Sequence, residues 1–153
     1  IEALTKLPGA HLIIAGNGPE GKRLRALSRR IGVAERVHLP GAIAPEPLAL
    51  VLSAADVMVL PSQNEGLANA WIEALACGTP LVITDVGGAR EVVATSSAGH
   101  LTQRNPDAIA AAIRDNLAQP PQQAEVASHA ARFSWEANAA QLSAHYRSVI
   151  PRL

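Results

Sequence analysis

The sequence lacks several features that would place it in other classes of protein. Cys77 is the single cysteine among 153 residues, so the chain can form neither an internal disulfide nor a cysteine-based metal cage. No apolar run approaches the length of a membrane span, and the first residues do not have the layout of a signal peptide. We therefore expect a cytoplasmic protein.

An excess of charge of one sign is also lacking. The 13 basic and 13 acidic residues cancel, which gives no broad electrostatic case for nucleic acid as a partner. Aromatic residues make up 3% of the chain, and we expect Phe133, Trp135 and Tyr146 to pack the last helix against the rest. With 48% hydrophobic residues, a chain of this length is predicted to fold as one globular domain.

Metal-binding patterns are missing as well. The sequence contains no Asp-x-Asp pair, and its five histidines, at positions 11, 38, 100, 129 and 145, show no ligand spacing. We expect no metal ion and no other cofactor.

What the sequence does contain is an alternation of short apolar runs with helical segments. This alternation predicts an α/β domain, Rossmann-like and three-layered, with a parallel sheet between helices on both faces. The expected strands cover residues 11–16, 36–41, 56–61, 81–84 and 98–101. The expected helices cover residues 19–31, 45–55, 68–76, 89–94, 108–117, 122–131 and the segment from Trp135 to about Ile150, with Asn105-Pro106 starting the fifth of them.

We interpret residues 1–153 as a single domain with an α/β core over about 1–104 and carboxyl-terminal helices over about 105–153. Residues 1–7 have the pattern of the last turns of a helix, which Pro8-Gly9 ends. An α/β domain normally starts with a strand. The first strand of the domain is therefore expected to be missing from this sequence.

The strongest candidate site lies in residues 62–80, a loop, a helix and a second loop. Glu65 and Glu73 are eight residues apart, a spacing that corresponds to about 12 Å along a helix and lets both carboxylates face one cleft. The amides of Gly66, Leu67 and Ala68 would point outward at the helix start, where phosphate binds well. Glutamates near a helix start can also serve only as partners of the helix dipole, and Asn69 or Ser62 only as caps.

The residues of this stretch resemble the signature of retaining glycosyltransferases of family 4 (group 1). The resemblance rests on Glu65-Gly66, Asn69, Glu73-Ala74, the run from Ala76 to Val82, Asp85 to Gly88, and Glu91. It implies the carboxyl-terminal, donor-binding half of a two-domain GT-B fold. It also implies transfer of a hexosyl-type sugar from a nucleotide-diphosphate sugar, with retention of configuration and without metal, in polysaccharide or glycolipid biosynthesis.

The resemblance assigns roles to individual residues. Glu65, as the catalytic carboxylate, would face the hydroxyls of the transferred sugar, and Glu73 would accept hydrogen bonds from the ribose. The backbone would bind the rest of the donor: the diphosphate at Gly66, Leu67 and Ala68, the base at Gly41, Ala42 and Ile43, and the underside of the nucleotide at Gly16 and Gly18.

The sequence departs from the family in two respects. Ala68 stands where proline is common. The Arg and Lys that grip the diphosphate in this family would precede Ile1, as would the amino-terminal domain that binds the acceptor sugar or lipid. We expect residues 1–153 alone to bind a donor weakly and to transfer nothing. In the family the last helix crosses back onto that other domain, from which any association with the inner membrane would also arise.

Other functions remain open at this point. Residues 16–21 fit the G-x-G-x-x-G fingerprint of dinucleotide-binding oxidoreductases. However, Pro19 lacks an amide hydrogen, and no carboxylate follows the next strand to bind ribose. A glycosidase would also use two carboxylates, but it needs no phosphate site. A sugar-nucleotide epimerase of the GT-B type and a non-catalytic sugar-nucleotide-binding module are the further alternatives.

Overall fold

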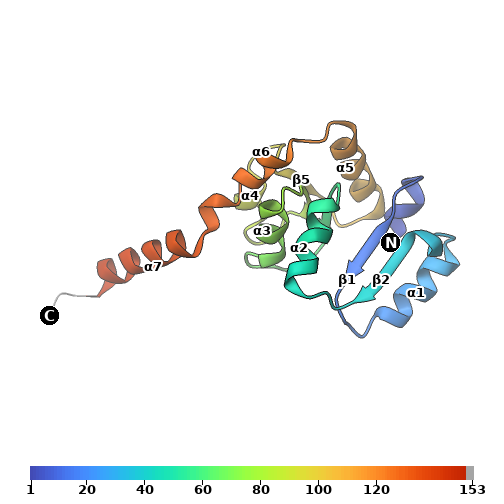
Figure 1. The fold of residues 1–153 in the computed structure, drawn as a ribbon, viewed down its shortest axis with the longest axis horizontal. Helices are drawn as coiled ribbons and strands as arrows, with labels where there is room; N and C mark the ends of the chain where they lie inside the picture. Colours follow the sequence, from blue (N-terminus) through green and yellow to red (C-terminus); the bar gives the residue numbers. More distant parts are fainter. Residues whose placement is uncertain (151–153) are drawn as a thin grey trace.

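The computed structural model describes residues 1–150, and its elements follow the predicted order (Figure 1). The strands are β1 (Leu12–Ala15), β2 (Val37–Gly41), β3 (Met58–Leu60), β4 (Leu81–Thr84) and β5 (Gly99–Thr102). The α-helices are α1 (Gly21–Arg30), α2 (Pro45–Ala54), α3 (Asn69–Ala76), α4 (Ala89–Val92), α5 (Pro106–Ala118), α6 (Gln123–Ser128) and α7 (Trp135–Val149). Short 3₁₀ helices are η1 (Glu2–Lys6), η2 (Ala34–Arg36) and η3 (Ala131–Phe133), so the opening segment is a 3₁₀ helix.

All strand pairs are parallel, which confirms the predicted α/β class, but the strands form two sheets. β1 pairs with β2, and β3, β4 and β5 form a second sheet in that order. The continuous sheet that the alternation suggested is therefore divided between β1 and β3. β1 and β3 do not hydrogen bond to each other, so each of them is an edge strand of its own sheet.

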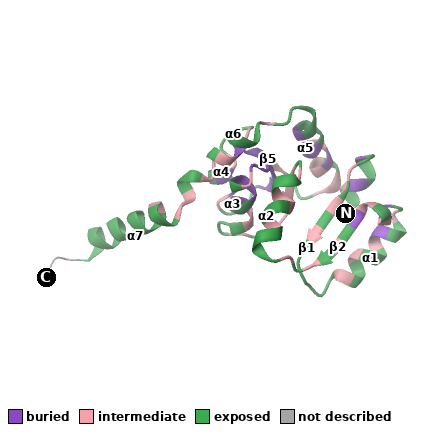
Figure 2. Ribbon diagram, viewed as in Figure 1, coloured by how far each residue is buried: buried purple, intermediate pink, exposed green. Residues whose placement is uncertain are grey.

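The three-stranded sheet has helices on both faces, as predicted. Leu81 and Ile83 of β4 pack against α3, α4 and α6, in a cluster that includes Trp71 and Val126. Val82, on the opposite face of the same strand, packs against Ala110 and other residues of α5. All four residues of β4 are buried, so this strand is the centre of the larger core (Figure 2).

The β1–β2 pair is covered on one face only. Leu12, Ile14, Val37 and Leu39 contact a small core that contains Leu4 and Val33. The residues that alternate with them are exposed: His11, Ile13, His38 and Pro40. Ile13 is 50% exposed, which is unusual for an isoleucine within a strand.

The segment around η1 connects the two sheets. Leu4 belongs to the core of the β1–β2 pair, and Leu7 packs with Val82 and α5 on the other sheet. The Arg36 guanidinium donates hydrogen bonds to the carbonyls of Leu4, Leu7 and Ala10 at 3.2, 2.8 and 3.0 Å. Lys6 forms an ion pair of 2.7 Å with Asp107 of α5. The same short segment therefore packs against one face of both sheets.

Helix α7 extends away from the rest of the molecule (Figure 1). Phe133 packs against the main core, but Trp135 is 87% exposed and Tyr146 is 53% exposed. The prediction that all three aromatic residues pack the last helix is therefore wrong for Trp135 and Tyr146. No residue of α7 is buried, so within residues 1–150 this helix has no neighbouring element against which the two side chains could pack.

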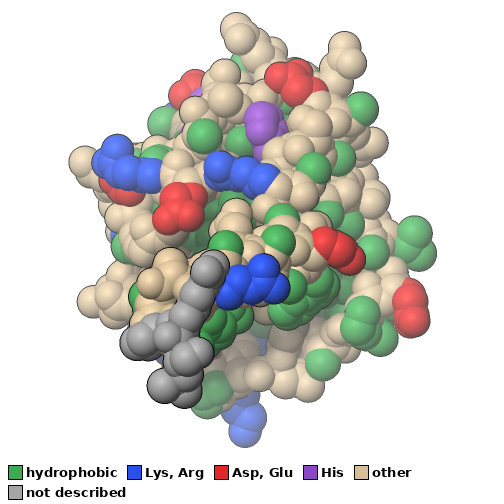
Figure 3. All heavy atoms as spheres, turned by 90° about the vertical axis from the view of Figure 1, so that its left-hand side faces the viewer, with side chains coloured by type: hydrophobic (Ala, Val, Ile, Leu, Met, Phe, Trp, Pro, Cys, Tyr) green, Lys and Arg blue, Asp and Glu red, His purple; other side chains and the backbone are tan. Residues whose placement is uncertain are grey.

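The surface agrees with the balanced charge of the sequence. On the side from which α7 extends, basic and acidic side chains are interspersed with hydrophobic ones (Figure 3). Across residues 1–150, no helix combines the length and the apolar character that crossing a bilayer requires.

We predict that truncating Leu75 destabilises the protein strongly, because its side chain is fully buried in the main core. Leu75→Ala should lower the free energy of unfolding by about 2–5 kcal/mol in urea titrations. Leu50→Ala is the matched control, since Leu50 in α2 is 73% exposed and its loss should change stability by less than about 0.5 kcal/mol. Equal losses for the two variants would contradict this core assignment.

Candidate functional site

The loops after β1 and β2 lie side by side. The amide of Gly16 donates to the carbonyl of Gly41 at 2.8 Å, and a Cβ atom at position 41 would lie 3.0 Å from Oδ1 of Asn17. Gly41 has a φ of +85°, which favours glycine. The structure thus brings the predicted residues Gly16 and Gly41 together, with Asn17 beside Gly41.

The loop between β3 and α3, residues 61–68, is held by hydrogen bonds that its backbone carbonyl groups accept from other parts of the chain. The hydroxyl of Thr84, at the end of β4, donates to the carbonyl of Ser62. The amide of Gly88 donates to the carbonyl of Gly66 at 2.7 Å, and Arg104 Nε donates to that of Pro61 at 3.0 Å. These bonds fix the backbone of the loop that carries Glu65.

Gly87 lies in the loop after β4 and allows that loop to approach the β3–α3 loop closely. A Cβ atom at this position would lie 2.1 Å from the carbonyl oxygen of Glu65 and 2.4 Å from that of Gly66. Its φ of +53° also favours glycine. Only a residue without a side chain fits here without moving the Glu65 backbone.

Glu65 is half-buried, and its carboxylate is oriented by a neighbour. The hydroxyl of Ser62 donates to Glu65 Oε1 at 2.7 Å. Ser62 was considered only as a helix cap, but the position before α3 is Ala68, and no side chain caps the helix. The contact of Ser62 with Glu65 was therefore missed; their spacing of three residues in a loop is the only signal that the sequence offered.

Glu73 lies on the exposed face of α3, four residues after its first residue, which corresponds to about 6 Å along the axis. Within residues 1–150, neither Glu65 nor Glu73 forms an ion pair, whereas Asp85 pairs with Arg90. The two carboxylates therefore remain available to accept hydrogen bonds from a ligand.

The amino end of α3 offers hydrogen-bond donors next to these carboxylates. Among the described residues, no protein acceptor is found for the amides of Gly66, Leu67 and Ala68. Gly66 is exposed, and so is Leu67, at 45%. Together with the helix dipole, such amides favour an anion at this end of α3.

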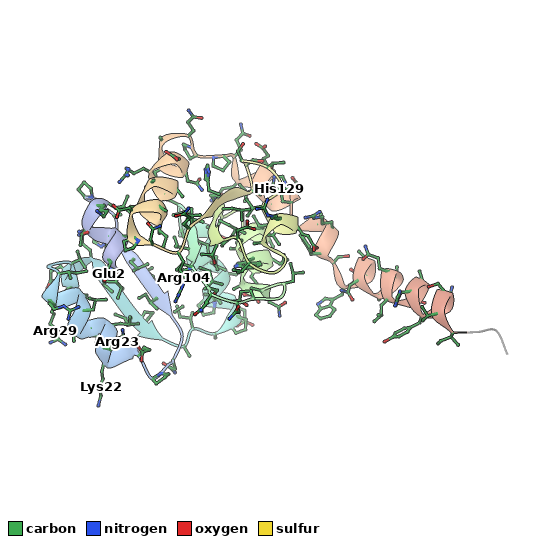
Figure 4. All side chains as sticks on the ribbon, turned by 180° about the vertical axis from the view of Figure 1, so that it is seen from behind. Glu2, Lys22, Arg23, Arg29, Arg104 and His129 are labelled. Carbon is green, nitrogen blue, oxygen red and sulfur yellow. The ribbon has the colours of Figure 1, made fainter. Side chains whose placement is uncertain are left out.

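Other residues near the site have structural roles or face away from it. Trp71 is fully buried and belongs to the core, not to a ligand pocket. Lys22 points away from the ribbon at the edge of the molecule, and Arg23 pairs with Glu20 at 2.6 Å (Figure 4). Arg104 lies nearer the centre of the same view, where its bond to Pro61 places a cation beside the β3–α3 loop.

An open groove of about 480 Å³ lies beside the β1–β2 pair, where Ile13, His38, Ile43 and Val51 are among its lining residues. Ile43 is the predicted site residue that this groove includes. No group of three or more histidine, cysteine or acidic side chains in residues 1–150 is arranged to hold a metal ion.

Comparisons with known proteins agree on one family. The family model described as Glycosyl transferases group 1 matches residues 1–133. The chain is 39% identical over 161 residues to the D-inositol 3-phosphate glycosyltransferase of Segniliparus rotundus, covering 97% of this chain and 35% of that protein. For the enzyme of the same name from Mycobacterium marinum the identity is 37% over 164 residues, with 98% and 35% covered.

Solved structures show the same architecture. Sucrose-phosphate synthase from Thermosynechococcus elongatus superposes with a TM-score of 0.83 at 33% identity, over 96% of this chain and 40% of that one. The HepE protein of Anabaena, in complex with UDP and glucose, superposes with a TM-score of 0.79 at 26% identity, over 97% and 43%. The fold is therefore the Rossmann-like α/β fold found in GT-B glycosyltransferases.

The chain spans 35% of the length of each of the two curated relatives compared above. The family match ends at Phe133, before α7 begins, and includes both candidate carboxylates and every loop of the candidate site. By this match, the chain belongs to the Glycosyl transferases group 1 family.

Proposed function

We propose that residues 1–153 are the donor-binding domain of a retaining glycosyltransferase of family 4, which takes a hexosyl-type sugar from a nucleotide-diphosphate sugar. One observation carries this proposal above the others. Within residues 1–150, Glu65 and Glu73 form no ion pair, and they flank the amides without a protein acceptor at the start of α3, a helix that follows a parallel strand. Ligands of α/β sheets bind at this end of the strands.

The two carboxylates would recognise different hydroxyl groups of the donor. Glu73, exposed one turn into α3, would accept hydrogen bonds from the ribose. Glu65 would face the transferred sugar, with Ser62 holding one of its oxygens and leaving the other for a sugar hydroxyl. A carboxylate suits both tasks, because hydrogen bonds to an ionised acceptor are stronger than neutral ones.

The amides of Gly66, Leu67 and Ala68 would bind the diphosphate. Negative charge develops on the leaving diphosphate as the glycosidic bond breaks, so donors that are already oriented lower the barrier. The loops containing Gly16, Gly18 and Gly41–Ile43 would contact the nucleotide through their backbone. No metal ion and no other cofactor forms part of this proposal.

Two observations favour this function over the alternatives. The solved HepE structures of Anabaena contain UDP, UDP with glucose, or UDP-glucose, at 26% identity to this chain. Membership in the glycosyltransferase family favours interpreting residues 16–21 as a donor loop instead of a dinucleotide fingerprint.

We further propose that the acceptor sugar or lipid binds to a domain outside residues 1–153, which α7 contacts. All residues of α7 are at least partly exposed, as expected of a helix whose partner lies elsewhere. Peripheral binding of the cytoplasmic protein at the inner membrane would arise from that domain. The names of the relatives suggest D-inositol 3-phosphate as an acceptor to test.

The first test is calorimetric titration of the intact protein with UDP, GDP, ADP and NAD, with and without Mg²⁺. One nucleoside diphosphate should bind without Mg²⁺. Glu73→Ala should weaken its binding about 10- to 100-fold, because charged hydrogen bonds to the ribose are lost. Glu65→Ala should leave the nucleoside diphosphate bound normally but abolish the gain in affinity that the sugar provides, and it should abolish transfer.

Glu125→Ala is the matched control, since Glu125 is an exposed carboxylate on α6 and is not among the residues proposed to bind the donor. Binding of NAD alone, or unchanged binding in Glu73→Ala, would overturn the assignment. The anomeric configuration of the product, determined by NMR, tests retention. A product with inverted configuration would contradict the proposed retaining mechanism.

Ser62→Ala should slow sugar transfer without weakening nucleotide binding. Losing a hydrogen bond to a carboxylate costs about 1.5–3 kcal/mol, which corresponds to about a 10- to 100-fold lower kcat if Glu65 acts on the sugar. Steady-state kinetics of the intact enzyme would show this change, with the Kd of the nucleoside diphosphate as the internal control. Ser62→Thr keeps the hydroxyl and should restore much of the rate; failure of this rescue would show that Ser62 does not position Glu65 through its hydroxyl.

Gly87→Ala should disrupt the donor site through the backbone of its neighbour. The added Cβ atom would overlap the carbonyl oxygens of Glu65 and Gly66, so the loop must move. We expect donor binding to weaken at least about 10-fold by calorimetry, the size of a lost charged hydrogen bond. Gly21→Ala is the control, because Gly21 starts α1 with no atom within 4 Å of its new Cβ and should leave binding unchanged.

A further inference from the structure

The loops that follow β3, β4 and β5 contain three charged residues, Glu65, Asp85 and Arg104. The three strands are parallel, so their loops share the carboxyl-end edge of the sheet, where ligands of α/β sheets bind. Asp85 pairs with Arg90, whereas Glu65 and Arg104 form no ion pair in the part of the chain that the structure describes. One carboxylate and one guanidinium at this edge therefore remain available to a ligand.

The side chain of Arg104 points along this edge toward β3. Arg104 follows β5, in which Thr102 is level with Thr84, the last residue of β4. Its Nε atom donates a hydrogen bond of 3.0 Å to the carbonyl of Pro61, the residue after β3. Because β4 lies between β3 and β5, those two strands are about 10 Å apart. The side chain therefore reaches past the end of β4 instead of pointing outward from the edge strand, and Figure 4 shows it toward the middle of the molecule.

The backbone on both sides of Arg104 is fixed. Asn105 caps α5, because its Oδ1 atom accepts a hydrogen bond from the amide of Ala108 at 2.8 Å. The amide of Asn105 donates to the carbonyl of Gln103 at 2.8 Å, and its Nδ2 atom donates to Oε1 of Gln103 at 3.3 Å. Arg104 thus lies in a turn whose conformation is held before any ligand binds. A side chain that is already oriented loses less entropy on binding.

Most of the hydrogen-bonding capacity of Arg104 is unused. A guanidinium carries several N–H donors, and Nε supplies only one of them. Across residues 1–150, no protein acceptor is found for Nη1 or Nη2 of Arg104. Arg36 differs, because its Nη atoms donate to three carbonyls and hold the η1 segment. A guanidinium with free Nη groups matches the geometry of two phosphate oxygens.

Arg104 and Glu65 are supported by neighbouring residues of the same loop. Arg104 donates to the carbonyl of Pro61, and Ser62 donates to Glu65 Oε1 at 2.7 Å. Opposite charges supported in this way could pair, yet among the described residues they form no ion pair with each other. The two groups can therefore bind different parts of one ligand, hydroxyls at the carboxylate and a phosphate at the guanidinium.

We propose that Arg104 is a donor-binding residue whose Nη1 and Nη2 groups bind the phosphate that carries the transferred sugar. This inference rests on the proposed function, in which Glu65 faces that sugar. The bond between the sugar and this phosphate breaks during transfer, and its electron pair stays on the phosphate oxygen. The sugar passes to the acceptor hydroxyl, which releases its proton. A guanidinium held beside this phosphate stabilises the added negative charge and so lowers the barrier.

Nucleotide titrations of the intact protein test this role. Arg104→Met removes the charge and keeps an unbranched side chain. We expect it to weaken binding of the nucleoside diphosphate about 10- to 100-fold, because charged hydrogen bonds to the terminal phosphate are lost. The matching nucleoside monophosphate lacks that phosphate, so its dissociation constant should change by less than about 2-fold. Calorimetry measures the first dissociation constant, and NMR titration measures the weaker second one.

Two variants serve as controls. Arg114→Met alters another exposed arginine that donates to a distant carbonyl, that of Lys6 at 3.3 Å, and it should leave both dissociation constants unchanged. Arg104→Lys keeps the positive charge without the planar fork, so it should recover part of the lost affinity for the diphosphate.

The outcomes separate this role from a purely structural one. Equal losses for diphosphate and monophosphate in Arg104→Met would overturn the proposal, because Arg104 would then act only by holding the loop at Pro61. Unchanged binding of both nucleotides would also overturn it and would leave the proposed function intact. A wild-type protein that binds no nucleoside diphosphate would contradict the proposed function itself, and with it the role of Arg104.

Discussion

The burial of β4 on both faces and both edges is the constraint on which the rest of the structure depends. Its backbone groups bond to β3 on one side and β5 on the other, and its side chains alternate between the cluster of Trp71 and that of α5. β4 is parallel to both neighbours, so its last residue, Thr84, lies at the same edge of the sheet as the carboxyl ends of β3 and β5. The segment after Thr84 therefore emerges at the carboxyl-end edge of the sheet, directly beside the loop that follows β3.

The candidate site follows from that position. Thr84 bonds to the carbonyl of Ser62, Gly88 bonds to that of Gly66, and Gly87 is small enough for the two loops to touch. The orientation of Glu65 thus depends on the rigid end of a buried strand, with Ser62 adding a side-chain contact. The catalytic role proposed for Glu65 would need such support, because small displacements of a reacting group are costly in rate.

Local patterns in the sequence predicted the elements well, since apolar runs and breaks such as Pro8-Gly9 and Asn105-Pro106 act over a few residues. They could not predict which strand neighbours which, so the division between β1 and β3 was not foreseen. Contacts between distant residues were also missed: Arg104 and Pro61 are 43 positions apart. Trp135 was wrongly expected to be packed, because its apolar character indicates burial only where a partner exists. The donor-binding roles of the predicted loops remain predictions, although the structure groups those loops at strand ends.

The electrostatics of the site show what the described residues can contribute to a donor complex. A diphosphate and two glutamates are all negative, so neutral amides must be supplemented by cations for tight binding. Arg90 is paired with Asp85 and Arg23 with Glu20, while Arg104 is bonded to a carbonyl. In the proposed donor complex, Glu65 and Glu73 would accept hydrogen bonds from hydroxyls, the amides before α3 would donate to phosphate oxygens, and Arg104, which forms no ion pair within residues 1–150, would be the nearby positive charge.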